Sequence, residues 1–190
     1  TGPTHTYSLP GTYNVTLKVK TLNGCLVQKT VPVTIYSTPM AQMATTGFCA
    51  GLPGTLTDLS VCTDDVITSW HWTVNGTNVY TSQYPLFTPD TVGAFLVELA
   101  VSTAHGCRDT ARQTLMAYPL PEADFSFSPD FGTPPLTVSF VNLSSGSSSW
   151  LWDFGDGTGS STQQHPTYTY TQEGIFPVTL TAYSSIGCPA

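Results

Sequence analysis

The chain has 190 residues, of which 9% are charged and 40% are hydrophobic, and its formal net charge is −7. Five basic residues are too few to neutralise nucleic-acid phosphates or to hold the chain on an anionic membrane surface, so neither is an expected partner. The hydrophobic content is too high for a disordered chain, and no apolar run approaches the ~20 residues that span a bilayer. We therefore expect a folded protein that is not embedded in a membrane.

One pattern recurs along the chain. Residues 3–25 read PTHTYSLPGTYNVTLKVKTLNGC, and related segments return at residues 85–107 and 166–188. Their anchoring glycines Gly11, Gly93 and Gly174 lie 82 and 81 residues apart. Units of this length can each bury a small core, so the repetition predicts tandem domains. A strand follows each glycine, with its inward positions predicted at Tyr13, Val15, Leu17 and Val19, at Phe95, Val97, Leu99 and Val101, and at Phe176, Val178 and Leu180.

The repeat predicts three domains. Residues 1–38 would be the last strands of a first domain, residues 39–119 a complete domain, and residues 120–190 a domain without its final strand. The linkers near 37–39 and 118–121 are short and contain proline, which restricts bending, so we expect a stiff array. We also expect the end domains to be completed by further sequence or by strands from neighbouring copies.

The third unit shows the strand pattern most clearly. Residues 124–128 and 136–143 alternate between apolar and polar side chains, and Trp150, Trp152 and Phe154 share one face of the next strand. The turn 155–157 ends that strand, and residues 175–183 alternate again. Short strands separated by frequent turn signals predict an all-β sandwich.

Three short motifs in this unit resemble the signature of the PKD (polycystic kidney disease) domain. They are Trp152-Asp153-Phe154-Gly155-Asp156-Gly157, His165-Pro166-Thr167-Tyr168 and Gly174-Ile175-Phe176-Pro177-Val178. The first unit carries the second half of the signature, in His5-Thr6-Tyr7 and Gly11-Thr12-Tyr13. The middle unit departs from it, with Trp72-Thr73-Val74-Asn75-Gly76 in place of the acidic turn and Phe87 in place of the tyrosine.

This resemblance implies tandem immunoglobulin-like sandwiches that serve as spacer or interaction modules in extracellular proteins. Arrays with a cysteine after the last hairpin turn are similar to the large surface proteins of Bacteroidetes-type bacteria. The five cysteines form no CxxC pair and favour an oxidising compartment over a zinc site.

The immunoglobulin-like frame implies two disulfides. Cys62–Cys107 would lie within the middle domain, and Cys49–Cys188 would join it to the next domain, leaving Cys25 to pair with a cysteine upstream. In the alternative, Cys49 pairs with Cys107 and Cys62 is free.

The candidate site residues have structural interpretations beside the functional ones. Asp153 and Asp156 are weak calcium candidates, but we favour hydrogen bonds within their own tight turn. Trp72 and Trp152 fit core positions better than a sugar-binding platform, whereas Trp70 and Trp150 leave that choice open.

The repeated His5 and His165 are expected to support the fold, because no nucleophile motif accompanies them. We therefore predict neither an enzyme nor a bound cofactor.

Sugar attachment is a further possibility. Asn-linked acceptor patterns begin at Asn14, Asn75 and Asn142. Thr91 and Thr110 follow aspartates in a pattern that resembles the O-glycan acceptor of Bacteroidetes.

The sequence thus predicts a structural spacer module of a long extracellular filament, stalk or adhesin. Its expected partners are neighbouring repeats of the same chain or identical subunits. One alternative is an adhesion module that binds a glycan or a surface protein, with Tyr80, Tyr84, Phe87 and Tyr118 as candidate contacts. Another is an accessory region of a secreted hydrolase.

Overall fold

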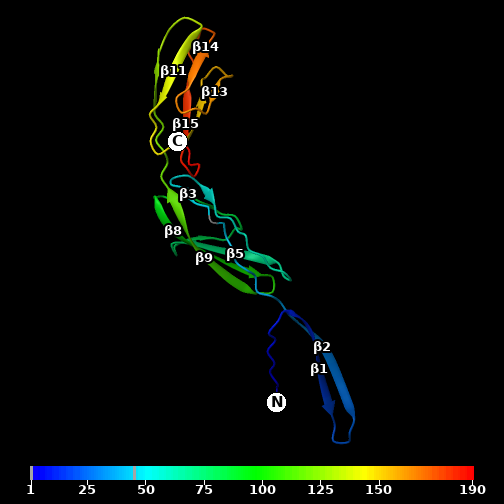
Figure 1. Cartoon of the computed structure of the whole chain (residues 1–190). Helices are drawn as coiled ribbons and strands as arrows, with labels where there is room; N and C mark the ends of the chain where they lie inside the picture. Colours follow the sequence, from blue (N-terminus) through cyan, green and yellow to red (C-terminus); the bar gives the residue numbers. More distant parts are fainter. Residues whose placement is uncertain (1, 45) are drawn as a thin grey trace. The chain divides into compact units, whose positions relative to one another are not determined.

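The computed structural model describes residues 2–44 and 46–190, with the side chain of Asn78 excepted. All regular elements in this part of the chain are β-strands (Figure 1). A helix long and apolar enough to cross a membrane does not occur among the described residues. The strands belong to two compact units, one with residues 2–44, 55–86 and 95–114, the other with residues 46–54, 87–94 and 115–190. Because these units divide the chain differently from the repeat, the predicted domain boundaries stay predictions.

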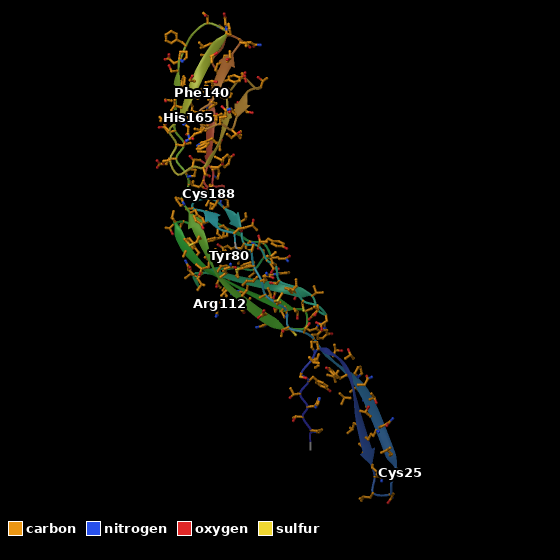
Figure 2. The ribbon with its side chains drawn as sticks, viewed as in Figure 1. Cys25, Tyr80, Arg112, Phe140, His165 and Cys188 are labelled. Carbon is orange, nitrogen blue, oxygen red and sulfur yellow. A yellow bond between two sulfur atoms is a disulfide. The ribbon has the colours of Figure 1, made fainter. Side chains whose placement is uncertain are left out.

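The N-terminal hairpin consists of β1 (Gly11–Lys20) and β2 (Leu26–Ile35), drawn in blue in Figure 1. All ten residues of β1 pair with β2 in an antiparallel register that runs from Gly11↔Ile35 to Lys20↔Leu26. Val15 and Leu17, which were predicted to face inward, are exposed, because β1 and β2 form a two-stranded sheet of their own on which no other described strand packs. Figure 2 shows Cys25 at its tip.

The middle of the chain forms a five-stranded sheet in the order β3-β9-β8-β5-β6. β9 passes from the first unit into the second between residues 114 and 115. In the first unit, Trp72, Val74, Val97, Leu99 and Val101 are buried, as the alternation of β5 and β8 predicts. The bounds are β3 (Phe48–Cys49), β5 (Ile67–Val74), β6 (Asn78–Tyr80), β8 (Gly93–Thr103) and β9 (Arg108–Tyr118), and a separate pair is formed by β4 (Gly54–Thr55) and β7 (Leu86–Phe87).

Residues 125–183, within the second unit, build a sandwich of two three-stranded sheets. One sheet has the order β10-β11-β14 and the other β13-β12-β15. Their core is the buried cluster of Val138, Phe140, Trp152, Phe154, Tyr170 and Leu180. The bounds are β10 (Phe125–Ser128), β11 (Leu136–Asn142), β12 (Ser149–Asp153), β13 (Ser160–Ser161), β14 (Thr167–Tyr170) and β15 (Thr179–Tyr183).

The strand predicted at residues 175–183 is shorter in the structure, because β15 begins only at Thr179. β12 pairs with Thr179–Tyr183 and reaches no further. Phe176 and Val178 still pack against the core, as predicted, but their backbone is not part of a strand. The side-chain pattern was therefore predicted correctly, and the strand is shorter because β12 pairs only with its last five residues.

Candidate functional site

The acidic turn after β12 is closed by its own hydrogen bonds. Asp153 Oδ1 accepts from the Gly155 amide at 2.9 Å. Asp156 Oδ1 accepts from the Thr158 and Gly159 amides at 3.0 and 2.8 Å, and the Tyr168 hydroxyl donates to Asp156 Oδ2. The Tyr168 hydrogen bond, followed by the two amide bonds, lowers the pKa of Asp156 to about 2. The same hydrogen bond to Asp156 raises the pKa of the Tyr168 hydroxyl.

The hydrogen bonds that we expected within the tight turn are therefore present. The described residues contain no group of three or more His, Cys, Asp or Glu side chains placed to hold a metal ion. Asp156 accepts hydrogen bonds from two backbone amides and a hydroxyl.

The four tryptophans are held through their indole N–H groups. Trp72 and Trp152 have no exposed surface, and they donate to the Ser82 carbonyl at 3.1 Å and to the Gln163 carbonyl at 2.8 Å. Trp70 donates to Asp58 Oδ2 at 2.7 Å, and Trp150 donates to Ser147 Oγ at 3.1 Å. The first two occupy the core, as the sequence predicted. Trp70, in the middle of β5, and Trp150, near the start of β12, are partly buried.

The histidines at the repeated position make local contacts. His165 Nδ1 accepts from the Asn142 amide at 3.1 Å, which ties the loop before β14 to β11 (Figure 2). His5 lies edge-on to Tyr7, with ring centroids 4.5 Å apart. These contacts fit the fold-supporting role expected of both residues.

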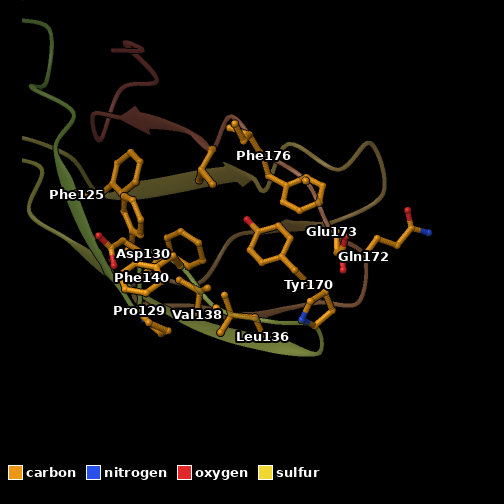
Figure 3. A pocket seen from close by; sticks show the side chains of 17 residues that line it. Phe125, Pro129, Asp130, Leu136, Val138, Phe140, Tyr170, Gln172, Glu173 and Phe176 are labelled. Atoms are coloured by element: carbon orange, nitrogen blue, oxygen red, sulfur yellow. The ribbon is translucent and has the colours of Figure 1, made fainter.

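A cavity of about 490 Å³ opens between β10, β11 and the segment of residues 172–178. Figure 3 shows Phe125, Phe140, Tyr170 and Phe176 around this hollow. The Tyr170 hydroxyl is already engaged, since it donates to the Phe154 carbonyl at 2.9 Å. The cavity was not predicted from the sequence, because the apolar residues that line it cannot be distinguished there from residues of a packed core.

A family model described as PKD domain matches residues 116–190, the part of the chain that contains the acidic turn and the sandwich around it. Residues 116–190 form a PKD domain. Among solved structures, the chain is similar to fibronectin type III-like modules of Clostridium thermocellum CbhA, with 14% identity over 80% of this chain and 89% of that one, at a TM-score of 0.50. With the observed sheets, that likeness shows the immunoglobulin-like sandwich fold.

Two further solved structures are similar to the chain. One is the PKD1 domain of Vibrio anguillarum Epp, with 19% identity over 44% of this chain and 96% of that one, at a TM-score of 0.40. The other comes from work on carbohydrate-binding modules of the β-sandwich superfamily, with 10% identity over 77% of this chain and 84% of that one, at a TM-score of 0.42.

A disulfide ties the PKD domain to an earlier part of the chain. Cys188 follows the hairpin turn after β15 and is bonded to Cys49 at the end of β3, 139 residues earlier. This confirms the predicted Cys49–Cys188 bond and excludes the alternative pairing of Cys49 with Cys107. Cys25 is a free, exposed thiol.

The second predicted bond, Cys62–Cys107, is not formed, and both residues are free thiols. Each sulfur instead lies near the linker that precedes the middle repeat. Cys62 Sγ is 3.8 Å from the Ser37 carbonyl oxygen, and Cys107 Sγ is 4.0 Å from the Tyr36 carbonyl oxygen. The linker backbone thus approaches both thiols, which the sequence-based frame did not anticipate.

That linker is fixed by a cluster of side chains from the loop after Cys62 and from the β8–β9 turn. The Ser37 amide donates to Asp64 Oδ1 at 3.0 Å, and its hydroxyl contacts Asp64 and Thr63. The Tyr36 ring stacks on His105, with centroids 3.8 Å apart and an interplanar angle of 14°.

His105 is itself held by Asp65. Its Nδ1 lies 3.1 Å from Asp65 Oδ1, and its amide donates to Asp65 Oδ2 at 3.1 Å. Hydrogen bonds from Thr103, and then from His105 and the Val66 amide, hold the pKa of Asp65 well below its usual range despite its burial. Sequence reasoning missed this cluster, because its members come from segments that lie far apart in the sequence.

The linker that leads into the PKD domain is held in a different way. The Tyr118 carbonyl accepts from the Ala50 amide at 2.8 Å, one residue beyond the disulfide-bonded Cys49. Glu122 and Ser145 then exchange backbone hydrogen bonds of 3.0 and 2.9 Å. Backbone hydrogen bonds and a disulfide thus hold this linker in place, whereas a side-chain cluster holds the first linker.

The remaining predicted contact and attachment residues differ in accessibility. Tyr84 is 53% exposed and Tyr118 is 38% exposed, and Tyr80 is half-buried. Phe87 is buried against Phe48, with ring centroids 5.5 Å apart, so it is not a surface contact. Asn14, Asn75, Thr91 and Thr110 are exposed, although Asn75 Oδ1 accepts from the Leu96 amide.

Asn142 is buried, and its side-chain oxygen accepts from the Ser144 amide at 2.9 Å. An attached sugar would displace this side chain from the folded domain. Asn142 is therefore not a suitable acceptor, which corrects the prediction made from its sequence pattern.

Proposed function

We propose that this chain is a structural spacer of a long extracellular surface filament, stalk or adhesin, built from tandem PKD-type units and without catalytic activity. The observation that carries the proposal is that both predicted linkers are fixed. Ser37 and Tyr36 are held by hydrogen bonds and ring stacking, and Tyr118 lies beside the Cys49–Cys188 bond. A linker fixed in this way transmits force and sets a reach, which a flexible tether does not.

The surface chemistry supports the same proposal. Charged side chains make up 9% of the chain, and threonines form rungs across exposed strands, such as Thr16–Thr30 with oxygens 2.8 Å apart. A hydrated surface with five basic residues offers few cleavage points to trypsin-like proteases. The PKD domain and the disulfide both favour an oxidising, extracellular setting.

Immunogold labelling of intact, unpermeabilised source cells tests the proposal. Antibodies against the chain should decorate surface fibres at regular spacing, and mild protease treatment of whole cells should remove the label. Label that appears only after permeabilisation, or only on a soluble enzyme in the medium, would contradict the proposal.

A binding role is the second candidate, and the exposure of Tyr84 is the observation that favours it. Exposed aromatic rings stack on sugars and provide affinity at protein contacts. If the chain binds a glycan or a host surface protein in this way, Tyr84→Ala should abolish binding on a glycan array or to the host surface. Thr81→Ala, at a nearby exposed position, is the matched control and should leave binding unchanged.

A further inference from the structure

A shallow groove of about 310 Å³ lies on the outer face of the five-stranded sheet. It crosses three neighbouring strands, β9, β8 and β5, and the opposite face of β8 and β5 carries the buried Leu99 and Trp72. The groove is therefore on the solvent side of a sheet whose other side is packed. Its lining residues are Ser69 and His71 of β5, Ala100, Val101 and Ser102 of β8, and Arg108 of β9.

Short side chains form the floor of the groove. His71 pairs with Ala100, and Ser69 pairs with Ser102, across β5 and β8. Because Ala100 and Ser102 are small, β8 is a low strip, with His71 on the strand to one side and Arg108 on the strand to the other. The Ser69 and Ser102 hydroxyl oxygens are 2.6 Å apart, and this hydrogen bond leaves one O–H group and several lone pairs for a ligand.

Arg108 brings an unpaired positive charge to the groove. Its guanidinium has no hydrogen-bond or ion-pair partner among the described residues. The next residue, Asp109, lies on the other face of β9 and accepts from the Ala41 amide at 2.8 Å. Glu98, which shares the outer face with Arg108, is already paired with Arg112. The groove is thus positively charged, although the net charge of the chain is −7.

The same face is basic in the first repeat. The counterparts of Ala100 and Ser102, 82 residues earlier, are Lys18 and Lys20, which are both exposed. Residues 1–38 contain no Asp or Glu. Four of the five basic residues of the chain therefore occupy the outer face of a repeat, namely Lys18, Lys20, Arg108 and Arg112. Basic charge gathered on one face of an acidic chain is complementary to an anionic ligand.

The lining of the groove favours an acidic sugar over a neutral sugar or a protein segment. Among the described residues, no Trp, Tyr or Phe side chain lines it, so a neutral sugar ring would find no stacking surface and a protein segment no aromatic anchor. A planar carboxylate matches the paired N–H groups of a guanidinium. The volume is at the small end of ligand pockets, which hold ~300–1,000 Å³, and suits one sugar ring.

We propose that this groove binds a carboxylated sugar residue of an acidic polysaccharide. Arg108 donates two N–H groups to the carboxylate, and the Ser69–Ser102 pair and His71 exchange hydrogen bonds with the ring hydroxyls. This site goes beyond the spacer role and does not depend on it, because a spacer needs no ligand.

Titration of the full chain with a short oligogalacturonate, followed by calorimetry, tests the site. Binding should be saturable and should weaken at least several-fold when NaCl is raised from about 0.05 M to about 0.5 M, because the ligand is held by charge at an exposed surface. In NMR spectra the shifted backbone signals should include those of His71, Ser102 and Arg108. No binding at millimolar oligogalacturonate, or shifts confined to other strands, would overturn the proposal.

Three variants separate the groove from general attraction between charges. Arg108→Gln removes the charge that pairs with the carboxylate and should weaken binding at least ten-fold. Ala100→Gln fills the floor without changing the charge and should weaken binding as much, while the fold tolerates a long side chain there, since Lys18 occupies the equivalent position. Lys29→Gln removes one charge from β2, which does not line the groove, and should change the affinity by less than about two-fold. Equal losses for Arg108→Gln and Lys29→Gln, or unchanged binding by Ala100→Gln, would overturn the proposal.

Three other polymers test the chemical class of the ligand. Methyl-esterified oligogalacturonate keeps the sugar rings but loses the charge, and it should bind at least ten-fold more weakly. Dextran sulfate and poly-glutamate keep negative charge without a carboxylated sugar, and both should also bind at least ten-fold more weakly. Binding of either polymer as tight as that of oligogalacturonate would mean that the groove accepts polyanions or acidic peptides in general, and would overturn the proposal.

The test is independent of the proposed functions. None of its outcomes depends on where the protein resides, so the immunogold experiment can fail while oligogalacturonate binds, and the reverse. Tyr84 does not line the groove, so Tyr84→Ala should leave oligogalacturonate binding unchanged. A ten-fold loss with Tyr84→Ala would place the ligand outside the groove and would overturn the proposal.

Discussion

Gly155 shows how a single residue closes the acidic turn of the PKD domain. Its φ of +77° lies in the region that favours glycine, and a Cβ at this position would come within 2.5 Å of the Pro177 carbonyl oxygen. Gly157 has nearly the same φ, +78°, but a Cβ there would meet no atom within 4 Å. The two glycines of one motif are thus required for different reasons.

Substitution of the two glycines should separate backbone strain from overlap. Gly157→Ala should cost about 1 kcal/mol of unfolding free energy, from the positive φ alone. Gly155→Ala should cost a further ~1–3 kcal/mol, because the new methyl group overlaps backbone that cannot rotate away. Urea unfolding of both variants measures the difference. Equal losses would show that the contact with Pro177 is not tight.

Asp156 predicts a specific pH dependence. Its folded-state pKa of about 2 lies below the ordinary value of 3.8, so its contribution to stability is complete above pH 3.8 and is lost as the pH falls from about 3.8 towards 2. Asp156→Asn should flatten the fall in Tm over that range. Tyr168→Phe should flatten it in part, because the tyrosine hydroxyl is the largest cause of the shift.

The matched control for Asp156 is Asp130→Asn, which removes an exposed aspartate from the same domain. It should keep the slope of Tm against pH seen in the unmodified chain. If all three variants follow the same curve, the stability lost at low pH does not come from the turn.

At the residue scale, local motifs were predictable and distant contacts were not. Local patterns predicted the turn aspartates and the buried Trp72 and Trp152, since period-two alternation and turn-forming residues can be recognised within a few positions. The cluster of Tyr36, Asp65 and His105 joins segments about 30 and 70 residues from the linker. No local pattern encodes which of several exposed polar residues will meet there.

At the scale of elements, the length of β15 depends on its neighbours. The alternation of residues 175–183 is continuous, yet only Thr179–Tyr183 form a strand, the five residues that β12 covers. Sequence alternation shows which side chains face inward, but a ladder also needs a partner for its N–H and C=O groups. A similar alternation in the middle repeat forms the eleven-residue strand β8, which has a neighbouring strand on each side.

Hydrogen exchange should detect this boundary. The amides of Thr179 and Thr181, which face β12, should exchange slowly, whereas those of Ile175 and Phe176 should exchange at rates near those of exposed loops. Val97 and Leu99 in β8 provide the internal reference, because they occupy paired positions in a complete sheet. Slow exchange at residues 175–176 would contradict a strand that begins at Thr179.

At the scale of the whole molecule, the tandem repeat predicted one disulfide correctly and one wrongly. Cys49–Cys188 follows from placing each hairpin cysteine at the end of a sandwich that faces another repeat. Cys107 is the counterpart of Cys188, so the same reasoning places it at the end of its sandwich near the preceding repeat. Its sulfur does lie there, beside the Tyr36 carbonyl of the linker. Cys62 was predicted as its partner only because both cysteines lie at the same end of the domain. Sharing an end does not determine whether two sulfurs come within bonding distance.

The disulfide makes a mechanical prediction. It closes a loop with a sequence separation of 139 residues, which cannot lengthen under tension while the bond is intact. At up to ~3.6 Å per residue, reduction should add about 500 Å to the contour length released in single-molecule pulling of the full chain. Cys49→Ala should release the same length without a reducing agent, because it removes the bond. Cys25→Ala, at the exposed hairpin cysteine, is the control and should match the oxidised chain. An oxidised chain that already releases the full length would show that the bond does not carry load, and the proposed spacer would then depend on its folded strands alone.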